Sequence, residues 1–382
     1  MNPSEFTESA PGELVNTIEG IWAFVPHPLP PAFSIETSTI RRLSEADYKL
    51  GELKGIGQML PNPQLLINPF LRREAVLSSR IEGTIASLDQ LVLFEVEPSR
   101  DSQNPDVGEV ANYVTAMKYG LQRLEELPVS LRLIREIHEK LLSGVRGQDR
   151  RPGEFRQTQN AIGQQGRPID EARYIPPPVI QMNQALSEFE LFLHEPTELP
   201  FLIQLALVHY QFEAIHPFLD GNGRVGRLLL SLLLCEKGYL TQPLLYLSGF
   251  LEKNRDQYID SLLRVSQKGD WTGWVDFFLQ GVVEQSSDAI DRSGLLLDLL
   301  QNYREKAQTA RASALPLQLV DNLFQAPALT ISMAQELLGV TPISAQRSIE
   351  RLVDLDILKE ITGRQRNRIY VAPEIISIAS AE

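Results

Sequence analysis

Midway along the chain stands the run His216-Pro217-Phe218-Leu219-Asp220-Gly221-Asn222-Gly223-Arg224-Val225-Gly226-Arg227, which concentrates the unusual chemistry of the sequence. Helical patterns flank this run, so several of its backbone N–H groups fall at a helix N-terminus, where an anion is favoured. Gly221 and Gly223 allow the backbone to approach a phosphate closely. Arg224 and Arg227 lie three residues apart, share one helix face and suit phosphate oxygens. The run therefore predicts a phosphate-binding turn.

Two further side chains in this run suit catalysis. Asp220 offers a hard oxygen ligand for Mg²⁺, which takes one or two carboxylates together with phosphate oxygens. His216 is the one side chain of the run that can act as a base near neutral pH. The glycines also match a dinucleotide-binding fingerprint, but a helical pattern rather than a strand precedes them, which excludes that class. The sequence contains no P-loop motif either.

The bulk composition is typical of an ordinary globular protein. The 382 residues are 43% hydrophobic and 22% charged, and this length suits two or three domains. The single cysteine, Cys235, cannot form an internal disulfide, the N-terminus lacks a signal-peptide pattern, and the apolar run 228–235 is too short to span a membrane. These observations predict a cytoplasmic protein without a membrane segment. The net charge of −13 means that any contact with DNA needs a local basic patch.

Helical periodicity dominates the chain and predicts a mainly α fold. Four parts are expected: an N-terminal arm and helical region (1–105), a core (106–285), a linker helix (286–312) and a small separate domain (313–382). The proline-rich residues 1–40 are expected to form an extended arm on the surface. Residues 146–178, rich in Arg, Gly and Pro, are expected to be a loop with a short β-hairpin.

The last part of the chain resembles a winged helix. It shows helical patterns at 316–325, 331–338 and 342–354, followed by short strands at 357–362 and 367–371. The second helix of a helix-turn-helix can lie in the major groove of DNA. However, residues 314–382 contain six Lys and Arg against eight Asp and Glu. DNA binding and a protein-interaction or dimer role therefore both stay open.

The run His216–Arg227 resembles, at every specified position, the H-P-F-x-[DE]-G-N-G-R-x-x-R motif of the Fic family of adenylyltransferases. Other segments are similar to further parts of that family: Pro152–Arg156 with Asn160 to its P-G-x-F-R segment, 172–177 to its flap, and 247–258 and 269–278 to the helices that close the nucleotide site. The resemblance implies a Fic-type helical bundle with a short β-hairpin flap, followed here by the winged helix.

The resemblance also implies transfer of AMP from ATP to Tyr, Thr or Ser hydroxyls of a target protein, the chain itself included. His216 would be the base and Asp220 the Mg²⁺ ligand. The ATP and phosphate contacts it implies are Gly221, Asn222, Gly223, Arg224, Val225, Gly226, Arg227, Tyr246 and Asn254. The flap residues Arg173, Tyr174 and Ile175 would hold the target backbone as an added strand.

A second motif lies upstream, where Ser78-Ser79-Arg80-Ile81-Glu82-Gly83 is similar to the inhibitory motif [ST]-x-x-x-E-[GN] of the same family. The match implies that Ser78 and Glu82 are inhibitory, with Glu82 pairing with Arg227 in place of the γ-phosphate. Gly83 is expected to end the helix that carries them.

Two other functions and two other partners stay open at this stage. The same residues would serve an enzyme that removes AMP from proteins, or a DNA-binding regulator whose core only senses nucleotide. The expected partners are ATP and the hydroxyl of a target protein, with a homodimer and DNA left open. His209 is expected to be a packing residue, and His138 a structural or surface residue.

Overall fold

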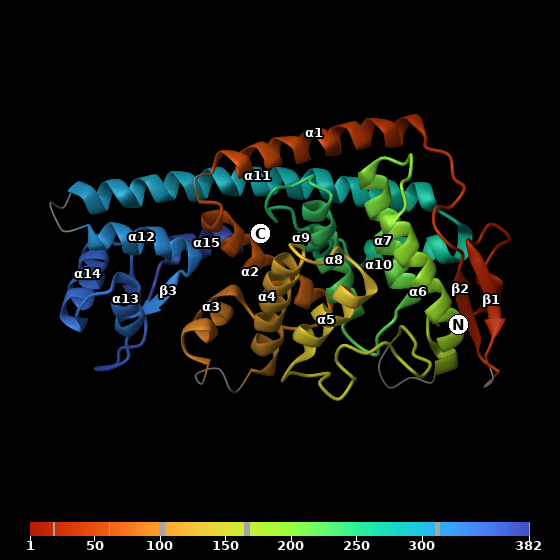
Figure 1. Ribbon diagram of the computed structural model, residues 1–382, viewed down its shortest axis with the longest axis horizontal. Helices are drawn as coiled ribbons and strands as arrows, with labels where there is room; N and C mark the ends of the chain where they lie inside the picture. The colour runs from red at the N-terminus through yellow and green to blue at the C-terminus, as the bar shows by residue number, and fades with distance from the viewer. Residues whose placement is uncertain (18–19, 61, 99–103, 164–168, 310–313, 382) are drawn as a thin grey trace.

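The computed structural model describes the chain except residues 18–19, 61, 99–103, 164–168, 310–313 and 382 (Figure 1). Most described residues lie in helices, which confirms the mainly α fold class. Among the described residues, no helix is both long enough and apolar enough to cross a membrane.

Among the described residues, a short hairpin and eleven α-helices form the larger part of the molecule. In chain order they are β1 (Gly12–Asn16), β2 (Trp22–Pro26), α1 (Thr37–Met59), α2 (Gln64–Ile81), α3 (Leu88–Val96), α4 (Pro105–Arg123), α5 (Leu131–Leu142), α6 (Val179–His194), α7 (Phe201–Ile215), α8 (Asn222–Glu236), α9 (Ser248–Lys253), α10 (Arg255–Lys268) and α11 (Trp271–Thr309). The helices α1 and α11 run side by side along one edge of the molecule (Figure 1).

The N-terminal residues form an antiparallel β-hairpin where an extended arm was expected. Ala23 and Phe24 in β2 are fully buried, and the backbone N–H of Phe24 donates to the carbonyl of Ile175 at 2.9 Å. The prolines that suggested an arm lie after the hairpin or at its ends, where no ladder hydrogen bond is lost. This segment therefore belongs to the body of the protein and covers the flap region.

The helices α7 and α8 form the centre of the core. Both are buried around most of their circumference, which explains their continuous apolar sequence rather than a one-sided pattern. Trp274 of α11 is fully buried beside them and donates its indole N–H to the carbonyl of Ala206 at 2.9 Å. The turn between α7 and α8 is consequently held by a rigid helix on each side.

The helix α2, which carries the upstream motif, is enclosed on several sides. Fifteen of its 18 residues are buried. It packs on α4 and α9 of the core, and also on α12 (Leu315–Gln325) and α15 (Pro373–Ser380) near the C-terminus. Gly83 follows it with a φ of +95°, a left-handed conformation that suits glycine after a helix. The expectation for the end of this helix is confirmed.

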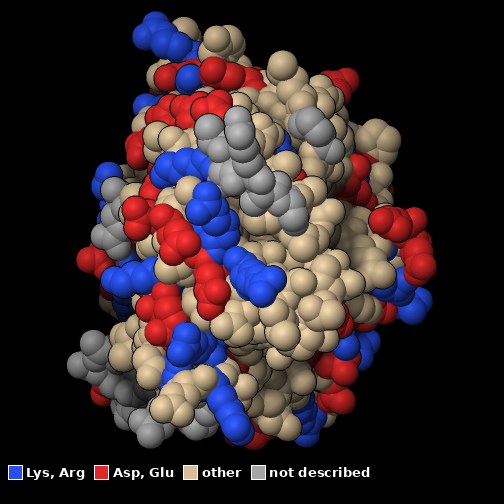
Figure 2. All heavy atoms as spheres, turned by 90° about the vertical axis from the view of Figure 1, so that its left-hand side faces the viewer, with Lys and Arg blue, Asp and Glu red and all other residues tan. Residues whose placement is uncertain are grey.

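The C-terminal elements form a small unit of helices with one three-stranded sheet. Between α12 and α15 lie β3 (Ala328–Thr330), α13 (Ile331–Leu338), α14 (Pro342–Asp354), β4 (Lys359–Glu360) and β5 (Ile369–Val371). The sheet is antiparallel with the order β3-β5-β4. Figure 2 shows this end of the molecule, where acidic and basic side chains are interspersed beside a broad uncharged area. The expected boundary at residue 312 lies outside the described residues.

This C-terminal unit is bound to the rest of the protein by charged contacts. Arg73 of α2 lies 3.2 Å from the carboxylate of Asp288 in α11. Arg292 binds the same carboxylate through two nitrogens, each at 2.8 Å, and donates to the carbonyls of Ile378 and Ala381. A continuous set of contacts thus joins the upstream motif's helix to the last helix of the chain.

Candidate functional site

The turn between α7 and α8 is built by its own side chains. His216 ends α7 with a φ of +48°, and Gly221 precedes α8 with a φ of +78°. Left-handed backbone is costly for a residue other than glycine, so the surroundings must hold His216 in place. Asn222 does part of this, because its amide accepts from the N–H of Phe218 at 2.8 Å and donates to the carbonyl of Phe218 at 2.9 Å. The side chain of Asn222 closes the turn, while its backbone begins α8.

The imidazole of His216 is oriented by the helix that precedes it. Its Nδ1 lies 3.3 Å from the carbonyl oxygen of Glu213. A proton on Nδ1 satisfies that carbonyl and leaves Nε2 as the unprotonated nitrogen. Burial, together with the charge of Arg156, lowers the pKa of His216 to about 4. The ring is therefore neutral at physiological pH and able to accept a proton.

The loop that precedes α6 supports the turn from below. Arg156 is almost fully buried and donates to the carbonyls of His216 at 3.0 Å, Thr158 at 3.2 Å and Pro177. Asn160 donates to the carbonyl of Phe218 at 2.9 Å. These contacts link the turn to the two ends of the flap segment.

His138 is a member of this site that sequence reasoning placed among structural or surface residues. Its ring stacks on Phe218 with centroids 3.7 Å apart. Its Nδ1 accepts from the N–H of Gly153 at 2.9 Å, which leaves the proton on Nε2 to donate to the carbonyl of Asp220 at 3.0 Å. Both ring nitrogens are used, and His138 fixes the backbone beside the Asp220 carboxylate. A lone histidine 82 residues away in sequence gave no signal of this role.

Arg224 belongs to a buried charged cluster, of which the sequence predicted Arg224 and Asp220 but not Glu109. Its guanidinium lies 3.0 Å from Glu109 and 3.6 Å from Asp220. The side chains of Arg224 and Glu109 are 2% and 1% exposed, so the ion pair is shielded from water. Glu109 also lies 3.0 Å from Arg146. Glu109 was missed because a single carboxylate on α4 carries no local motif.

Arg227 is held by the upstream motif. Its Nε donates to the hydroxyl of Ser78 at 2.9 Å, and its Nη2 donates to the carbonyl of Ser78 at 2.9 Å and to the carboxylate of Glu82 at 2.8 Å. Burial works against the charge on Glu82, but the guanidinium outweighs it, and the pKa of Glu82 is lowered. The structure thus brings Ser78, Glu82 and Arg227 together, as the motif implied.

The carboxylate of Glu82 lies directly over the first turn of α8. A Cβ atom added at Gly223 would overlap Oε1 of Glu82 and would lie 2.8 Å from Arg227. Glycine is therefore required at this position for a negatively charged group to approach the helix N-terminus. The place where a phosphate would be favoured is the place that the Glu82 carboxylate takes.

Asp220 is suited to hold a metal ion jointly with a ligand. Its carboxylate is 40% exposed, and its Oδ1 accepts from the N–H of Gly221 at 2.6 Å. Within the described residues, no cluster of three or more His, Cys, Asp or Glu side chains could hold a metal by itself. Mg²⁺ fits such a site, because it keeps few protein ligands and takes phosphate oxygens as well.

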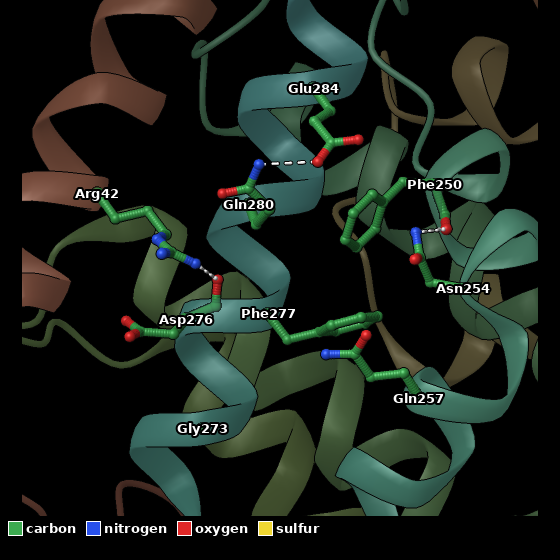
Figure 3. A pocket seen from close by; sticks show the side chains of 9 residues that line it. All are labelled: Arg42, Phe250, Asn254, Gln257, Gly273, Asp276, Phe277, Gln280 and Glu284. Atoms are coloured by element: carbon green, nitrogen blue, oxygen red, sulfur yellow. Dashed lines mark hydrogen bonds between the residues drawn. The ribbon is translucent and has the colours of Figure 1, made fainter.

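Val225, Gly226, Tyr246 and Asn254 were also predicted to contact ATP. Val225 is fully buried, and a Cβ added at Gly226 would meet the carboxyl of Glu213 rather than open space. Tyr246 is buried beside Glu74 and Arg73, around a cavity of about 20 Å³. Asn254 lines a separate cavity of about 350 Å³ between α1, α9, α10 and α11 (Figure 3). None of the residues that line these two cavities belongs to the turn 216–227.

The described part of the flap is held against the body of the protein. Ile162 and Tyr174 form one antiparallel bridge, so the expected hairpin reduces to a single pair among the described residues. The side chains of Tyr174 and Ile175 are buried, and the hydroxyl of Tyr174 donates to the carbonyl of Ala214 at 2.9 Å. Arg173 is exposed and lies 2.7 Å from Asp260.

A larger cavity lies beside this flap. It has a volume of about 630 Å³ and is lined by Met1, Asn2, Glu5, Glu171, Ala172, Arg173, Leu263 and Gln267. Of these residues, Arg173 was predicted as a site residue and Ala172 as part of the flap. The N-terminal segment reaches the cavity through Glu5, whose carboxylate accepts from the amide of Gln267 at 2.8 Å.

Comparison with known proteins is consistent with this geometry. Residues 40–122 match the family described as Fic/DOC family N-terminal, and residues 128–234 match the Fic/DOC family. A protein adenylyltransferase Fic of Drosophila grimshawi is 30% identical over 256 residues, which cover 64% of this chain and 48% of the relative. A probable protein adenylyltransferase of Aquifex aeolicus (strain VF5) is 30% identical over 216 residues, which cover 54% and 59%. The chain thus spans about half the length of the curated relatives it matches.

One solved structure extends the likeness of the fold to most of the chain. A Fic family protein from Desulfovibrio desulfuricans G20 superimposes with a TM-score of 0.56 at 18% identity, covering 90% of this chain and 98% of that protein. At this level of identity the comparison supports the shared fold.

Proposed function

Since this chain belongs to the Fic/DOC family, we propose that it transfers AMP from ATP to a hydroxyl group of a target protein and that Glu82 inhibits this transfer. One observation carries the proposal. The Glu82 carboxylate lies on the N-terminal turn of α8 and pairs with Arg227 at 2.8 Å. That position favours a phosphate group. The neutral imidazole of His216 lies at the other end of the short segment that joins α7 to α8.

The reaction uses the residues of the turn as follows. The Nε2 nitrogen of His216 takes the proton of the target hydroxyl. The hydroxyl oxygen forms a bond to the α-phosphorus of ATP, the bond from that phosphorus to the bridging oxygen breaks, and pyrophosphate leaves. The N–H groups at the start of α8 stabilise the charge that develops on the α-phosphate. Arg224 and Arg227 position the remaining phosphates, and such alignment is worth about 10²-fold in rate per ångström.

Asp220 is the residue that would hold Mg²⁺ together with phosphate oxygens. When bound, the ion would neutralise the charge of the departing pyrophosphate. The side chain of His138 donates to the main-chain carbonyl of Asp220, and the guanidinium of Arg224 lies 3.6 Å from the Asp220 carboxylate. Asp220 therefore binds and orients rather than transfers a proton.

Glu82 inhibits by occupying the group that the γ-phosphate needs. A bound triphosphate that cannot reach Arg227 is displaced along the site, and its α-phosphate is no longer aligned with His216. The exposed flap edge near Arg173 is where the target would bind.

The decisive experiment incubates the Glu82→Gly variant with labelled ATP and Mg²⁺, and locates the label by mass spectrometry. We expect at least about tenfold more AMP transfer than in the unsubstituted protein, equivalent to about 1.4 kcal/mol. The matched control is Glu125→Gly, which removes an exposed carboxylate and should leave transfer unchanged. Equal labelling by the Glu82→Gly and control variants would refute inhibition by Glu82, and no labelling by any variant would refute the transfer itself.

Removal of AMP from a protein is a second candidate, because a carboxylate whose charge interacts with His216 also suits the activation of a water molecule. Loss of label from a preformed AMP–protein adduct, faster with Glu82 than with Gly at this position, would favour it. A DNA-binding regulator whose core only senses nucleotide is the third candidate, and we also propose a homodimer and a cytoplasmic location. A mobility shift that weakens with salt tests DNA binding, and analytical ultracentrifugation tests the dimer.

A further inference from the structure

Arg146, in the loop that follows α5, is a third arginine beside the turn 216–227. Its Nε lies 3.0 Å from one oxygen of the Glu109 carboxylate, and its Nη2 donates to the other oxygen at 3.3 Å. Arg224 donates to that second oxygen as well, at 3.0 Å. Two guanidinium groups therefore share the carboxylate of Glu109, whose side chain is 1% exposed.

Arg146 differs from these two buried partners because its side chain is 58% exposed. It approaches Glu109 with the edge of the guanidinium that carries Nε. The end formed by its two terminal nitrogens can therefore bind a second anion, as the planar fork of arginine permits. Neutralising Glu109 does not require Arg146, because the buried guanidinium of Arg224 already pairs with the same carboxylate.

The loop that carries Arg146 is held against the carboxylate of Asp220. Gly147 has a φ of +90°, and a Cβ atom added to it would lie 3.0 Å from Oδ2 of Asp220. Glycine suits this position because of the left-handed backbone and because of the close approach. The carboxylate proposed to hold Mg²⁺ thus has the Arg146 loop beside Oδ2, while Arg224 lies 3.6 Å from Oδ1.

The charges of this cluster indicate which ligand its exposed side favours. Without a metal ion, the charges of Arg146 and Arg224 balance those of Glu109 and Asp220. Mg²⁺ at Asp220 would leave the cluster positive, since the ion is then the largest local charge. A ligand with several negative charges is favoured at such a site, and Arg146 is placed to contact it from solvent.

We propose that Arg146 is a further contact of the pyrophosphate part of ATP, positioned by Glu109 and by the approach of Gly147 to Asp220. Arg227 is buried and binds the γ-phosphate from the protein interior, whereas Arg146 contacts the pyrophosphate part from the solvent side. Arg146 therefore strengthens the binding of ATP and of the departing pyrophosphate. This inference rests on the proposed function, because it assumes that the triphosphate lies along the turn with Mg²⁺ at Asp220.

The test measures binding rather than transfer. The parent protein carries Glu82→Gly and His216→Ala, which free Arg227 and block turnover. Isothermal titration calorimetry in the presence of Mg²⁺ gives the Kd for ATP, for pyrophosphate and for AMP. These constants are compared between the parent and the same protein with Arg146→Ala or Arg146→Lys. The matched control is Arg150→Ala, because Arg150 lies in the same loop, is 59% exposed and lies 3.7 Å from Asp149.

Arg146→Ala should raise the Kd for ATP and for pyrophosphate about tenfold, a typical loss for a hydrogen bond to a charged group. The Kd for AMP, which lacks the pyrophosphate part, should change by less than about twofold. Lysine keeps the charge beside Glu109 but not the planar fork, so Arg146→Lys should give an intermediate loss. The control should leave all of these constants unchanged.

Two results would overturn the inference alone. One is binding of ATP and pyrophosphate that Arg146→Ala leaves unchanged. The other is an equal loss of affinity for AMP, which would show that Arg146 supports the turn as a whole rather than the pyrophosphate part. Failure of the parent protein to bind ATP at all would overturn the proposed function and this inference with it.

Discussion

The carboxylate of Glu82 lies 2.8 Å from the guanidinium of Arg227, although 145 residues separate them in the sequence. The guanidinium is nearly fully buried, while the carboxylate is 39% exposed. A pair of this kind is released by moving the carboxylate, because Arg227 is also bonded twice to Ser78. The geometry therefore assigns the moving part to Glu82.

His216→Ala should abolish AMP transfer in the Glu82→Gly background and leave ATP binding largely intact. Loss of a general base costs about 10²- to 10⁴-fold in rate. Because the pKa of His216 is lowered to about 4, the imidazole stays neutral as pH falls through 6.5. The initial rate of AMP transfer, measured as a function of pH, should therefore not fall near pH 6.5 and should decline only toward pH 4. A half-maximal rate near pH 6.5 would contradict the lowered pKa.

His138→Ala should weaken the response to Mg²⁺ in the Glu82→Gly background. His138 fixes the carbonyl of Asp220, and loss of such outer support typically reduces metal affinity by about 10- to 100-fold. The Mg²⁺ concentration for half-maximal transfer should rise accordingly. Glutamine can both donate and accept a hydrogen bond, so His138→Gln should restore part of the Mg²⁺ affinity. The control His194→Ala should leave the Mg²⁺ concentration for half-maximal transfer unchanged. A lower rate with an unchanged Mg²⁺ response would show that His138 acts on folding alone.

Glu109→Ala should strongly destabilise the protein. It leaves the buried guanidinium of Arg224 without its partner at 3.0 Å, and breaking a buried pair costs about 3–5 kcal/mol. The control Glu126→Ala removes the 74% exposed partner of Arg123 and should cost less than about 1 kcal/mol. The midpoints of urea unfolding measure the loss of stability in each of the two variants. Equal midpoints for the two variants would mean that water replaces Glu109.

Glu74 should make the stability of the protein depend on pH. Burial raises its pKa to about 7, while Tyr113 and Ser248 donate to its carboxyl. The folded protein therefore holds a proton that the unfolded chain has lost. The stabilisation is complete below about pH 4.5, is lost as pH rises to about 7, and amounts to roughly 3 kcal/mol. Glu74→Gln should remove this loss, measured as the difference in unfolding free energy between pH 5 and pH 8. If the unsubstituted protein and Glu74→Gln lost the same unfolding free energy between pH 5 and pH 8, Glu74 would not be the source of the pH dependence.

The parts of the fold that local chemistry specifies could be predicted from the sequence. The helix expected at 342–354 coincides with α14, because Thr341 accepts from the N–H of Ser344 and Pro342 suits the first helical position. The helix expected at 331–338 coincides with α13 for a similar reason, since the hydroxyl of Thr330 accepts from the N–H of Met333. The hairpin of β1 and β2 was not predicted, because the contact that fixes β2 on the body of the protein, from Phe24 to Ile175, joins residues far apart in the sequence.

The candidate site divides in the same way. The residues of the turn 216–227 and the motif around Glu82 form contiguous patterns, and the structure brings the two together. Glu109, His138 and Glu213 are single polar residues within helical patterns, and only the packing of α4, α5 and α7 against α8 places them at the site. Tyr246 and Asn254 are different, because residue type and resemblance suggested them as nucleotide contacts, and each lines a cavity that no residue of the turn 216–227 lines.

The enclosure of α2 limits how the proposed inhibition by Glu82 can be relieved. An activating partner cannot draw this helix outward, because fifteen of its 18 residues belong to the interior shared with the core and the C-terminal unit, and extraction would unfold both. What remains free to change is the rotation of one acidic side chain, or the unwinding of the final helical turn before Gly83. Movements so small are within the range of ordinary thermal fluctuation, so the resting protein should visit its active arrangement briefly even without a partner.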